Sequence, residues 1–389
     1  MEPERRLRVL IAAGGTGGHI YPGITIAETL KARRPDTEIL FVGTQRGLEA
    51  DIVPRAGFAF AAIPAHYLRR RLSLDVLRTG WTAFRGVVEA ARIVRRFRPH
   101  VAVGTGGYVS GPAMAAALLM RVPVVLQEQN AYPGLTNRLL GRFAACVALG
   151  HPEAKAYLGG GTRVVVTGNP IRRDVLTATR EAGLSKFGLD PDRKTLLVFG
   201  GSQGGRSINQ ALLVAAPLLM DRLGIQILHQ TGKAGFAAVV EEAERRMRAA
   251  APGTPVVRLD PEHVVLGRWH VVPYIHDMPA AYAAADLVVS RAGAITLAEI
   301  TARGLPAILV PYPFAAEGHQ DANARALAQA GAAVVVQDKD LDGDGLVAQV
   351  SALMENPGRL ARMSMASRAL ARPEAAQHIA DLIERAARG

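Results

Sequence analysis

Cysteine is nearly absent from this sequence, which contains Cys146 and no other thiol. A single cysteine cannot form an intramolecular disulfide, so the fold does not depend on an oxidising compartment. The chain also does not open with the charged, apolar and cleavable pattern of a secretory signal. We therefore expect the protein in a reducing cytoplasm.

Long apolar runs and aromatic residues are scarce as well. The longest apolar stretch, residues 113–120, is far too short to cross a bilayer, which excludes a spanning helix of ordinary length. Aromatic residues make up 5% of the chain, and few of them lie near its basic residues. No recognisable nucleic-acid module appears, so we expect no nucleic-acid partner.

Hydrophobic residues, by contrast, make up 49% of the 389 residues, and many of them are Ala, Val and Leu. This composition is typical of α/β layers, and the length predicts two domains because single cores rarely grow beyond roughly 250 to 300 residues. Residues 167–172, Thr-Gly-Asn-Pro-Ile-Arg, interrupt the regular pattern. We therefore place the domains at residues 1–169 and 170–389.

Short Val- and Ile-rich runs alternate with segments of helical length in both halves. The predicted strands are residues 8–12, 38–42, 59–63, 101–103, 122–126, 146–149 and 164–166, then 195–199, 225–229, 269–272, 287–290, 307–310 and 333–336. This alternation indicates two doubly wound parallel sheets covered by helices on both faces. Ligands of such sheets bind beyond the carboxyl ends of the strands.

Glycine-rich turns follow three of these strands and precede predicted helices. They occupy residues 13–23 (AGGTGGHIYPG), 104–112 (GTGGYVSGP) and 200–205 (GGSQGG). Such a turn presents backbone N–H groups and the positive end of a helix dipole, which suit an anionic ligand. The first turn is neither the usual dinucleotide fingerprint nor a P-loop, and a tight turn with a surface histidine, His19, is the alternative.

Polar clusters follow other strands. Residues 128–138 (EQNAYPGLTNR) suit a ligand rich in hydroxyl groups, although a solvated loop would look the same. Residues 290–299 (SRAGAITLAE) place a helix start after a strand, where Glu299 is either a ribose ligand or an acid favoured by the helix dipole. Residues 338–344 (DKDLDGD) lack the final carboxylate of a calcium loop, and we interpret them as a solvated acidic turn.

The positive charge is concentrated in the first half of the chain. Residues 1–169 contain 22 Lys and Arg against 11 Asp and Glu, a balance of +11 of the total +12. Nine arginines lie within residues 66–98, around apolar residues at helical spacing. The segment predicts an amphipathic helix on an anionic membrane surface. An ordinary core-facing helix with solvated arginines is the alternative, and nucleic-acid binding is a weaker third interpretation.

Seven of these segments occur in an order that resembles the MurG-type N-acetylglucosaminyltransferases of peptidoglycan synthesis, in glycosyltransferase family 28. They are residues 14–23, 104–112, 128–138, 168–172, 200–205, 290–299 and 319–323. The resemblance implies a GT-B fold, two Rossmann-like domains facing each other across a cleft, with the acceptor held by the first domain and the nucleotide sugar by the second. It also implies that the last helix can pack back on the first domain.

The resemblance further implies the reaction. N-acetylglucosamine would pass from UDP-N-acetylglucosamine to the C4 hydroxyl of the muramic acid sugar of lipid I, giving lipid II and UDP with inversion. The family needs no tightly bound cofactor, and we find no carboxylate pair for a metal at the site. The enzyme would work as a peripheral protein on the cytoplasmic face of the cell membrane, in cell-wall biogenesis, cell shape and division, with cell-wall synthesis proteins as partners.

Site residues carry over by motif. The expected substrate contacts are Thr16, Gly17, Gly18, Asn130, Arg172, Ser202, Ile275, Ala294, Ile295, Thr296, Leu297, Ala298, Glu299 and Gln320. Among them the backbone of Ile275 would meet uracil and Gln320 the sugar, with His319 as its competitor. The expected membrane face comprises Arg69, Arg70, Arg71, Leu74, Leu77, Arg78, Trp81, Phe84 and Arg85.

The chemistry requires a general base and stabilisation of the departing UDP. His19 has a suitable reference pKa near 6.5, and Glu128 is the competing base. Backbone N–H groups of the turns that begin at Gly200 and Ala292 would stabilise UDP. The alternatives are a UDP-N-acetylglucosamine 2-epimerase, a transferase for a plant-type or antibiotic acceptor, and a nucleotide-sugar or dinucleotide-binding module without transfer chemistry.

Overall fold

The computed structural model describes residues 6–65, 75–201, 204–253 and 255–389, without the side chains of residues 75–81 and 83. The chain divides into two compact units. Unit 1 comprises Met1–Ile171 and Arg372–Gly389, and unit 2 comprises Arg172–Ala371. The predicted second domain begins two residues early, and residues 372–389, which we assigned to it, belong to unit 1.

Unit 1 is built on a seven-stranded sheet in which all neighbouring strands are parallel, in the order β3-β2-β1-β4-β5-β6-β7. The strands are β1 (Arg8–Ala12), β2 (Glu38–Gly43), β3 (Ala59–Ala62), β4 (Val101–Gly104), β5 (Val124–Glu128), β6 (Cys146–Leu149) and β7 (Val164–Val166). Its helices are α1 (Gly17–Arg33), α2 (Glu49–Arg55), α3 (Asp75–Phe97), α4 (Ser110–Leu119), α5 (Leu135–Leu140), η1 (Gly141–Phe143), η2 (Pro152–Tyr157) and α15 (Ala375–Arg388).

Unit 2 contains an eight-stranded sheet in the order β10-β11-β12-β9-β8-β13-β14-β15. The strands are β8 (Thr195–Phe199), β9 (Gln226–Gln230), β10 (Val256–Asp260), β11 (His263–Leu266), β12 (Trp269–Val272), β13 (Leu287–Ser290), β14 (Ala307–Leu309) and β15 (Ala333–Val335). Its longer helices are α8 (Arg206–Leu223), α9 (Phe236–Ala250), α11 (Ala294–Arg303), α12 (His319–Gln329), α13 (Gly343–Met354) and α14 (Pro357–Ala369). The shorter ones are α6 (Arg173–Thr177), α7 (Arg180–Phe187), η3 (Lys233–Gly235), α10 (Met278–Ala284), η4 (Ala316–Gly318) and η5 (Asp338–Asp340).

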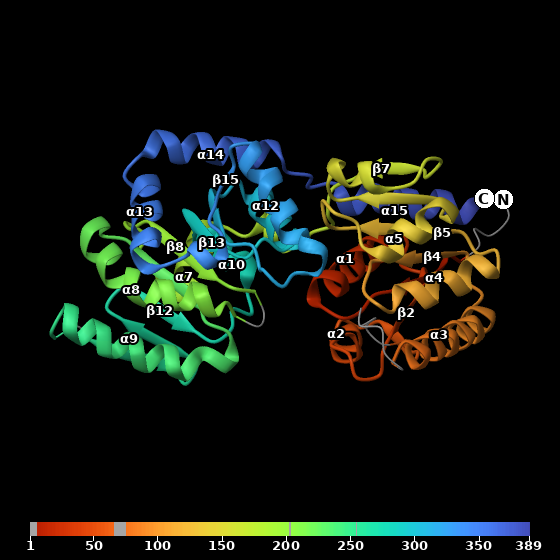
Figure 1. Cartoon of the computed structure of the whole chain (residues 1–389), viewed down its shortest axis with the longest axis horizontal. Helices are drawn as coiled ribbons and strands as arrows, with labels where there is room; N and C mark the ends of the chain where they lie inside the picture. Colours follow the sequence, from red (N-terminus) through yellow and green to blue (C-terminus); the bar gives the residue numbers. More distant parts are fainter. Residues whose placement is uncertain (1–5, 66–74, 202–203, 254) are drawn as a thin grey trace. The chain divides into compact units, whose positions relative to one another are not determined.

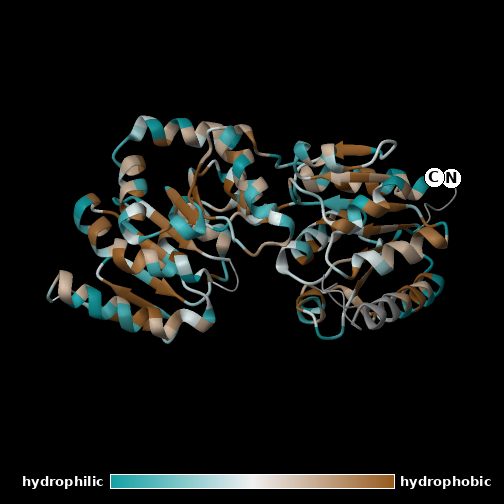
Figure 2. Cartoon of the chain, viewed as in Figure 1, coloured by the Kyte–Doolittle hydropathy of each residue, from teal (hydrophilic) through white to brown (hydrophobic). Residues whose placement is uncertain are grey.

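The predicted strands are all present, with bounds that either agree or differ by one or two residues. The predicted α/β class is therefore confirmed. Strands β10 and β11, which the sequence analysis did not predict, pair antiparallel with each other, and β11 pairs antiparallel with β12. Figure 2 shows the strands of both sheets largely in the brown of hydrophobic residues, as expected for sheets buried on both faces.

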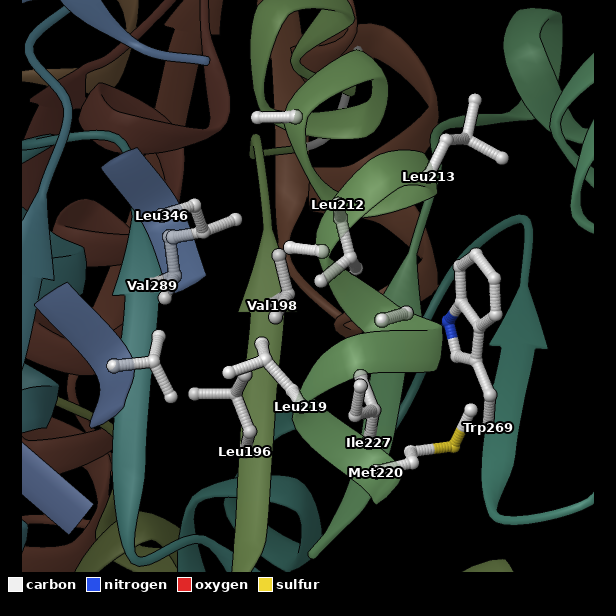
Figure 3. Close-up of a cluster of buried hydrophobic side chains, with 14 of the residues drawn as sticks. Leu196, Val198, Leu212, Leu213, Leu219, Met220, Ile227, Trp269, Val289 and Leu346 are labelled. Atoms are coloured by element: carbon white, nitrogen blue, oxygen red, sulfur yellow. The ribbon is translucent and has the colours of Figure 1, made fainter. Parts of the chain in front are cut away.

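Each sheet has its own core. In unit 2, Leu196 and Val198 of β8 pack with Leu212 and Leu219 of α8, and Trp269 of β12 joins them at no measurable exposure (Figure 3). In unit 1 the core includes residues from the far end of the chain, because Ile379 and Ile383 of α15 are fully buried there. Figure 1 shows α15, in blue, among the red to yellow elements of unit 1.

The strand orders fix where a ligand can bind. In unit 1 the order reverses between β1 and β4, and in unit 2 it reverses between β8 and β13. Open parallel sheets bind ligands beyond the carboxyl ends of the strands at such a reversal. The two reversals bring together the segments after β1 and β4 in one unit, and those after β8 and β13 in the other.

Candidate active site

His19 lies in the first turn of α1, directly after the glycine turn that ends β1. Its Nδ1 lies 3.3 Å from Thr16 Oγ1, and its main-chain oxygen accepts a hydrogen bond from Thr105 Oγ1 at 2.8 Å. A Cβ on Gly106, in the second glycine turn, would lie 2.6 Å from His19 Cδ2. Gly106 also has a φ of 103°, so both its conformation and the nearby imidazole require glycine. The sheet thus brings the two predicted turns together around His19.

The other predicted residues of this turn begin the helix. Thr16 is the N-cap of α1 and makes no side-chain capping bond, and Gly17 and Gly18 are the first helical residues. The first N–H groups of a helix have no acceptor within the helix. This turn is therefore suited to a ligand oxygen, as the sequence predicts.

A buried carboxylate that the sequence analysis missed supports the same turn. Glu49 of α2 has no exposed surface. Its Oε1 accepts from the Thr44 N–H at 2.8 Å and from Thr44 Oγ1 at 2.7 Å, and its Oε2 accepts from the Gly15 N–H at 3.2 Å. Glu49 therefore ties the end of β2 to the first glycine turn. Its sequence surroundings, an ordinary helix start, carry no signal of this role.

The Glu128 carboxylate is saturated with donors. Its Oε1 accepts from the N–H and Nδ2 of Asn130 at 3.0 and 3.2 Å, and its Oε2 accepts from the Gly134 N–H at 2.9 Å and Asn137 Nδ2 at 2.8 Å. Burial raises the pKa of Glu128, and these hydrogen bonds oppose the rise. The side chain is only 2% exposed. This geometry fits a residue that shapes the loop better than a base that receives a substrate proton, and it directs the Asn130 amide toward Glu128.

Three buried amides connect this loop to the glycine turns. Gln127 Nε2 donates to Asn169 Oδ1 at 3.0 Å, and Asn169 Nδ2 donates to the main-chain oxygen of Gln129 at 2.9 Å. Gln129 Nε2 donates to the main-chain oxygen of Thr105 and to Gln127 Oε1. Thr105 in turn holds His19, so the network joins the ends of β4 and β5 to the histidine.

In unit 2, Gln230 at the end of β9 joins two predicted donor loops. Its Nε2 donates to the main-chain oxygen of Gly201 at 2.9 Å, and its Oε1 accepts from the Ile275 N–H at 2.8 Å. The Ile275 N–H is therefore already paired, and its carbonyl oxygen is the backbone group that can accept a hydrogen bond from a nucleobase. The third glycine turn also packs closely, because a Cβ on Gly204, whose φ is 78°, would lie 2.2 Å from the main-chain oxygen of Thr231. Ser202 lies outside the described residues.

The predicted phosphate site lies at the start of α11. Its N-cap, Gly293, has extended backbone angles, and no side chain caps the helix. The predicted segment Ala294, Ile295, Thr296, Leu297, Ala298 and Glu299 forms the first turns of α11. The N–H groups of its first turn and the helix dipole favour an anion at this point.

The peptide before this helix is held from α12. Gln320 Oε1 accepts from the Ala292 N–H at 3.1 Å and the Tyr312 N–H at 3.0 Å, and Asn323 Nδ2 donates to the Ala292 oxygen at 3.2 Å. The Ala292 N–H is therefore already paired, and within this turn the proposed stabilisation of UDP falls to the N–H groups at the start of α11. Because the Gln320 carbonyl oxygen accepts these two hydrogen bonds, the predicted sugar contact would have to come from its amide nitrogen.

Arg172 and Glu299 form an ion pair. Arg172 Nη2 lies 3.0 Å from Glu299 Oε1, and the Glu299 side chain is buried at 8% exposure. Burial raises the pKa of the Glu299 carboxyl, and the charge and hydrogen bonds of Arg172 oppose that rise, together with a hydrogen bond from Tyr282. Arg172 and Glu299, two of the expected substrate contacts, thus orient each other.

The acidic turn after β15 is solvated as predicted at Asp340, Asp342 and Asp344, which are exposed, whereas Asp338 is paired. Asp338 Oδ1 lies 2.5 Å from Arg291 Nη1 and accepts from Ser207 Oγ. Asp342 caps α13 by accepting from the Gly345 N–H at 2.7 Å. Arg291 also donates to the main-chain oxygens of Val310 and Pro311. Arg291 and Asp338 therefore hold together the ends of β13 and β14 and the start of α8.

The predicted membrane face is described only in part. Arg69, Arg70, Arg71 and Leu74 lie outside the described residues, and Leu77, Arg78 and Trp81 are placed in α3 without their side chains. Of the rest, Phe84 is 58% exposed and Arg85 is exposed. Further along α3, Ala90 and Val94 are buried in the core of unit 1. The apolar side chains of α3 are thus core residues toward its end and exposed near residue 84.

The described residues contain neither a metal-binding cluster nor a membrane-spanning helix. No group of three or more His, Cys, Asp or Glu side chains among them has the arrangement of a metal site. No helix within the described segments has the length and apolar character needed to cross a membrane.

Two family descriptions match most of the chain. The Glycosyltransferase family 28 N-terminal domain matches residues 9–149, and the Glycosyltransferase family 28 C-terminal domain matches residues 195–380.

Similar proteins were found among curated sequences and solved structures. A UDP-N-acetylglucosamine--N-acetylmuramyl-(pentapeptide) pyrophosphoryl-undecaprenol N-acetylglucosamine transferase of Desulforudis audaxviator is 46% identical over 98% of this chain and 99% of its own. A protein of the same name from Moorella thermoacetica is 45% identical over 97% and 98%. The crystal structure of MurG from Acinetobacter baumannii superposes with a TM-score of 0.75 at 29% identity, over 97% and 99% of the two chains.

Proposed function

The chain belongs to glycosyltransferase family 28, and from this membership we propose that it transfers N-acetylglucosamine from UDP-N-acetylglucosamine to the undecaprenol-linked N-acetylmuramyl-(pentapeptide) acceptor of its relatives. Its fold is GT-B. The observation that carries the proposal is the near full-length similarity to relatives with this activity, at 46% identity. The products are lipid II and UDP, and the reaction serves peptidoglycan synthesis.

The proposed base is His19 of unit 1. In the tautomer with its proton on Nδ1, His19 donates to Thr16 Oγ1 and carries a lone pair on Nε2. That lone pair can take the proton of the acceptor C4 hydroxyl as its oxygen attacks the anomeric carbon. A single displacement of this kind inverts the configuration at that carbon. Glu128 is the weaker candidate, since four donors already occupy its oxygens.

Unit 2 supplies the proposed donor site. The departing UDP gains negative charge, and preorganised N–H groups stabilise such charge without reorganisation. The first turn of α11 offers these groups together with the helix dipole. In this proposal Glu299, oriented by Arg172, accepts hydrogen bonds from the ribose hydroxyls, and the Ile275 carbonyl accepts one from uracil.

The proposed location is the cytoplasmic face of the cell membrane, with the protein bound peripherally through the basic first half. The charge balance of +11 in residues 1–169 supports this proposal. Arginines are attracted only weakly to neutral lipid, so the proposed membrane surface is anionic.

The test is UDP release from UDP-N-acetylglucosamine, with and without a short-chain lipid I analogue. We expect release from the wild type only with the acceptor. His19→Ala should lower kcat on the order of 10²- to 10⁴-fold and leave UDP-N-acetylglucosamine binding unchanged. Glu128→Gln should reduce the stability of the fold and have only a smaller effect on kcat.

The other outcomes are equally informative. Release without acceptor would indicate hydrolase or epimerase chemistry, and UDP-sugar binding without any release would contradict the transferase assignment. Full activity of His19→Ala would remove the histidine from the chemistry. A larger loss of kcat in a well-folded Glu128→Gln variant would make Glu128 the base.

A further inference from the structure

We propose that a pocket of unit 1, next to the first glycine turn, binds the peptide arm of the acceptor. The inference rests on the proposed function, which supplies an acceptor carrying a pentapeptide. The pocket has a volume of about 780 Å³. It is formed by residues 44–46 after β2, residues 62–65 at the end of β3, α3 and Tyr108. These elements lie within unit 1 in Figure 1.

The lining of the pocket is positively charged. The described lining includes three arginines, Arg46, Arg85 and Arg92, and one acidic residue, Glu89. Arg92 is paired with Glu89 at 2.8 Å. Arg46 and Arg85 form no ion pair with any side chain of the described segments. Two guanidinium groups are therefore available for carboxylates, which they bind in a bidentate geometry.

Much of the remaining lining is apolar, and Thr44, Gln45 and Tyr108 add polar groups to it. Ala62, Ile63, Pro64 and Ala65 follow one another along the wall, and Phe84 and Val88 face them from α3. Ile63 is 3% exposed, so the wall is continuous with the core. A single phosphate or pyrophosphate needs neither this volume nor an apolar wall. A short peptide with a terminal carboxylate and apolar side chains matches both features.

The inner end of the pocket abuts the turn that carries His19. Tyr108 lies 3.5 Å from Thr44 through their hydroxyl oxygens, and its ring would lie 3.2 Å from a Cβ on Gly15. Glu49 binds both Thr44 and the Gly15 N–H. A sugar whose hydroxyl is at His19 therefore has the pocket next to it. The peptide is attached to that same sugar, so it can enter the pocket while the hydroxyl reacts.

The test compares two soluble acceptors, one with the pentapeptide and one without it, in detergent solution so that membrane binding plays no part. We expect Arg46→Gln and Arg85→Gln each to raise the KM for the peptide-bearing acceptor about tenfold. The KM for UDP-N-acetylglucosamine and the KM for the peptide-free acceptor should remain within about twofold of the wild type.

Arg95→Gln is the matched control, since Arg95 is an exposed arginine of α3 that does not line the pocket. It should behave as the wild type with both acceptors. An equal rise in KM with the peptide-free acceptor would overturn the assignment and point to the pyrophosphoryl group. Unchanged KM values in both arginine variants would overturn it as well. No transfer by the wild type to either acceptor would instead overturn the proposed function, and this inference with it.

Discussion

Single side chains in both units act mainly by holding backbone in place. Glu49 is not one of the proposed substrate contacts, yet its hydrogen bonds fix the turn before His19. Gln230 does the same for the loops that contain Gly201 and Ile275. At this scale the site consists of a few groups that meet substrate and a larger set of buried polar groups that position them.

Gln230 provides the prediction at this scale. Gln230→Met keeps the length of the side chain but leaves the Ile275 N–H and the Gly201 oxygen without their partner. Each unpaired buried group costs about 1–3 kcal/mol, which loosens both loops. We expect the KM for UDP-N-acetylglucosamine to rise about tenfold or more, with a smaller change in the acceptor KM. Initial rates at varied donor concentration measure this.

Gln226→Met is the matched control. Gln226 lies at the other end of β9, is equally buried, and bonds to the backbone of Asp190 and to Thr195. Its loss should reduce stability without changing the donor KM. If both variants raised the donor KM alike, Gln230 would have only a general structural role.

At the scale of elements, the regular part of the fold could be predicted and the irregular part could not. Buried parallel strands such as β1 and β8 are apolar after their first residue, so their positions follow from the sequence. Strand β10 is exposed along its length and contains Arg258 and Asp260, so it resembles a loop. Its place at the sheet edge depends on pairing with β11, which no local pattern encodes.

The candidate site shows the same division. The turns around His19 and before α11 were predicted, because glycines after a buried strand are a local signal. The pairing of Asp338 with Arg291 was not, since the two residues are 47 positions apart and their meeting depends on the sheet order. Likewise, nothing near Glu299 in the sequence indicates that Arg172 is its partner.

The buried contact between His229 of β9 and α8 provides a prediction about how stability depends on pH. His229 of β9 is fully buried, its Nε2 lies 3.0 Å from Asn209 Oδ1, and burial lowers its pKa to about 3. Because the folded protein holds this histidine neutral, stability is complete above the unfolded pKa of about 6.5. It declines as the pH falls from there toward 3. His270, whose pKa is lowered to about 4, acts in the same direction.

We expect the free energy of unfolding at pH 5 to be lower than at pH 7.5, by about 2 kcal/mol from His229 alone. His229→Gln keeps a hydrogen-bond donor for Asn209 and cannot be protonated. Its free energy of unfolding should therefore fall by about 2 kcal/mol less than that of the wild type. His378→Gln, which changes an exposed histidine of α15, should retain the full decrease. Urea unfolding at the two pH values measures the difference. Equal decreases in all three proteins would contradict this account.

At the scale of the whole molecule, charge separates the two halves of the chain. The first 169 residues carry +11 and the remainder +1. An asymmetry of this size orients a protein on a charged surface even where individual contacts are weak.

The corresponding prediction concerns vesicles that contain anionic lipid. Replacing Arg69, Arg70 and Arg71 with Glu should strongly reduce co-sedimentation with such vesicles at low salt, because each basic residue near the surface contributes about 1 kcal/mol. Turnover of a soluble acceptor analogue should not change. The matched control replaces Arg245, Arg246 and Arg248 of α9, which alters the net charge equally in unit 2. Unchanged vesicle binding in the first variant would refute this membrane face.

The return of the chain to unit 1 at Arg372 has a consequence for protein synthesis. The ribosome makes residues 1–171 first, but Ile379, Ala380 and Ile383, which complete the core of that unit, emerge last. Unit 2 is continuous in sequence and has all of its residues before α15 is translated. Nascent domains generally fold in the order of their synthesis, whereas here the unit begun first must be finished second. Until translation ends, part of the apolar surface of unit 1 stays exposed because α15 is still missing. We expect chaperones to recognise a chain that is held on a ribosome stalled before residue 372.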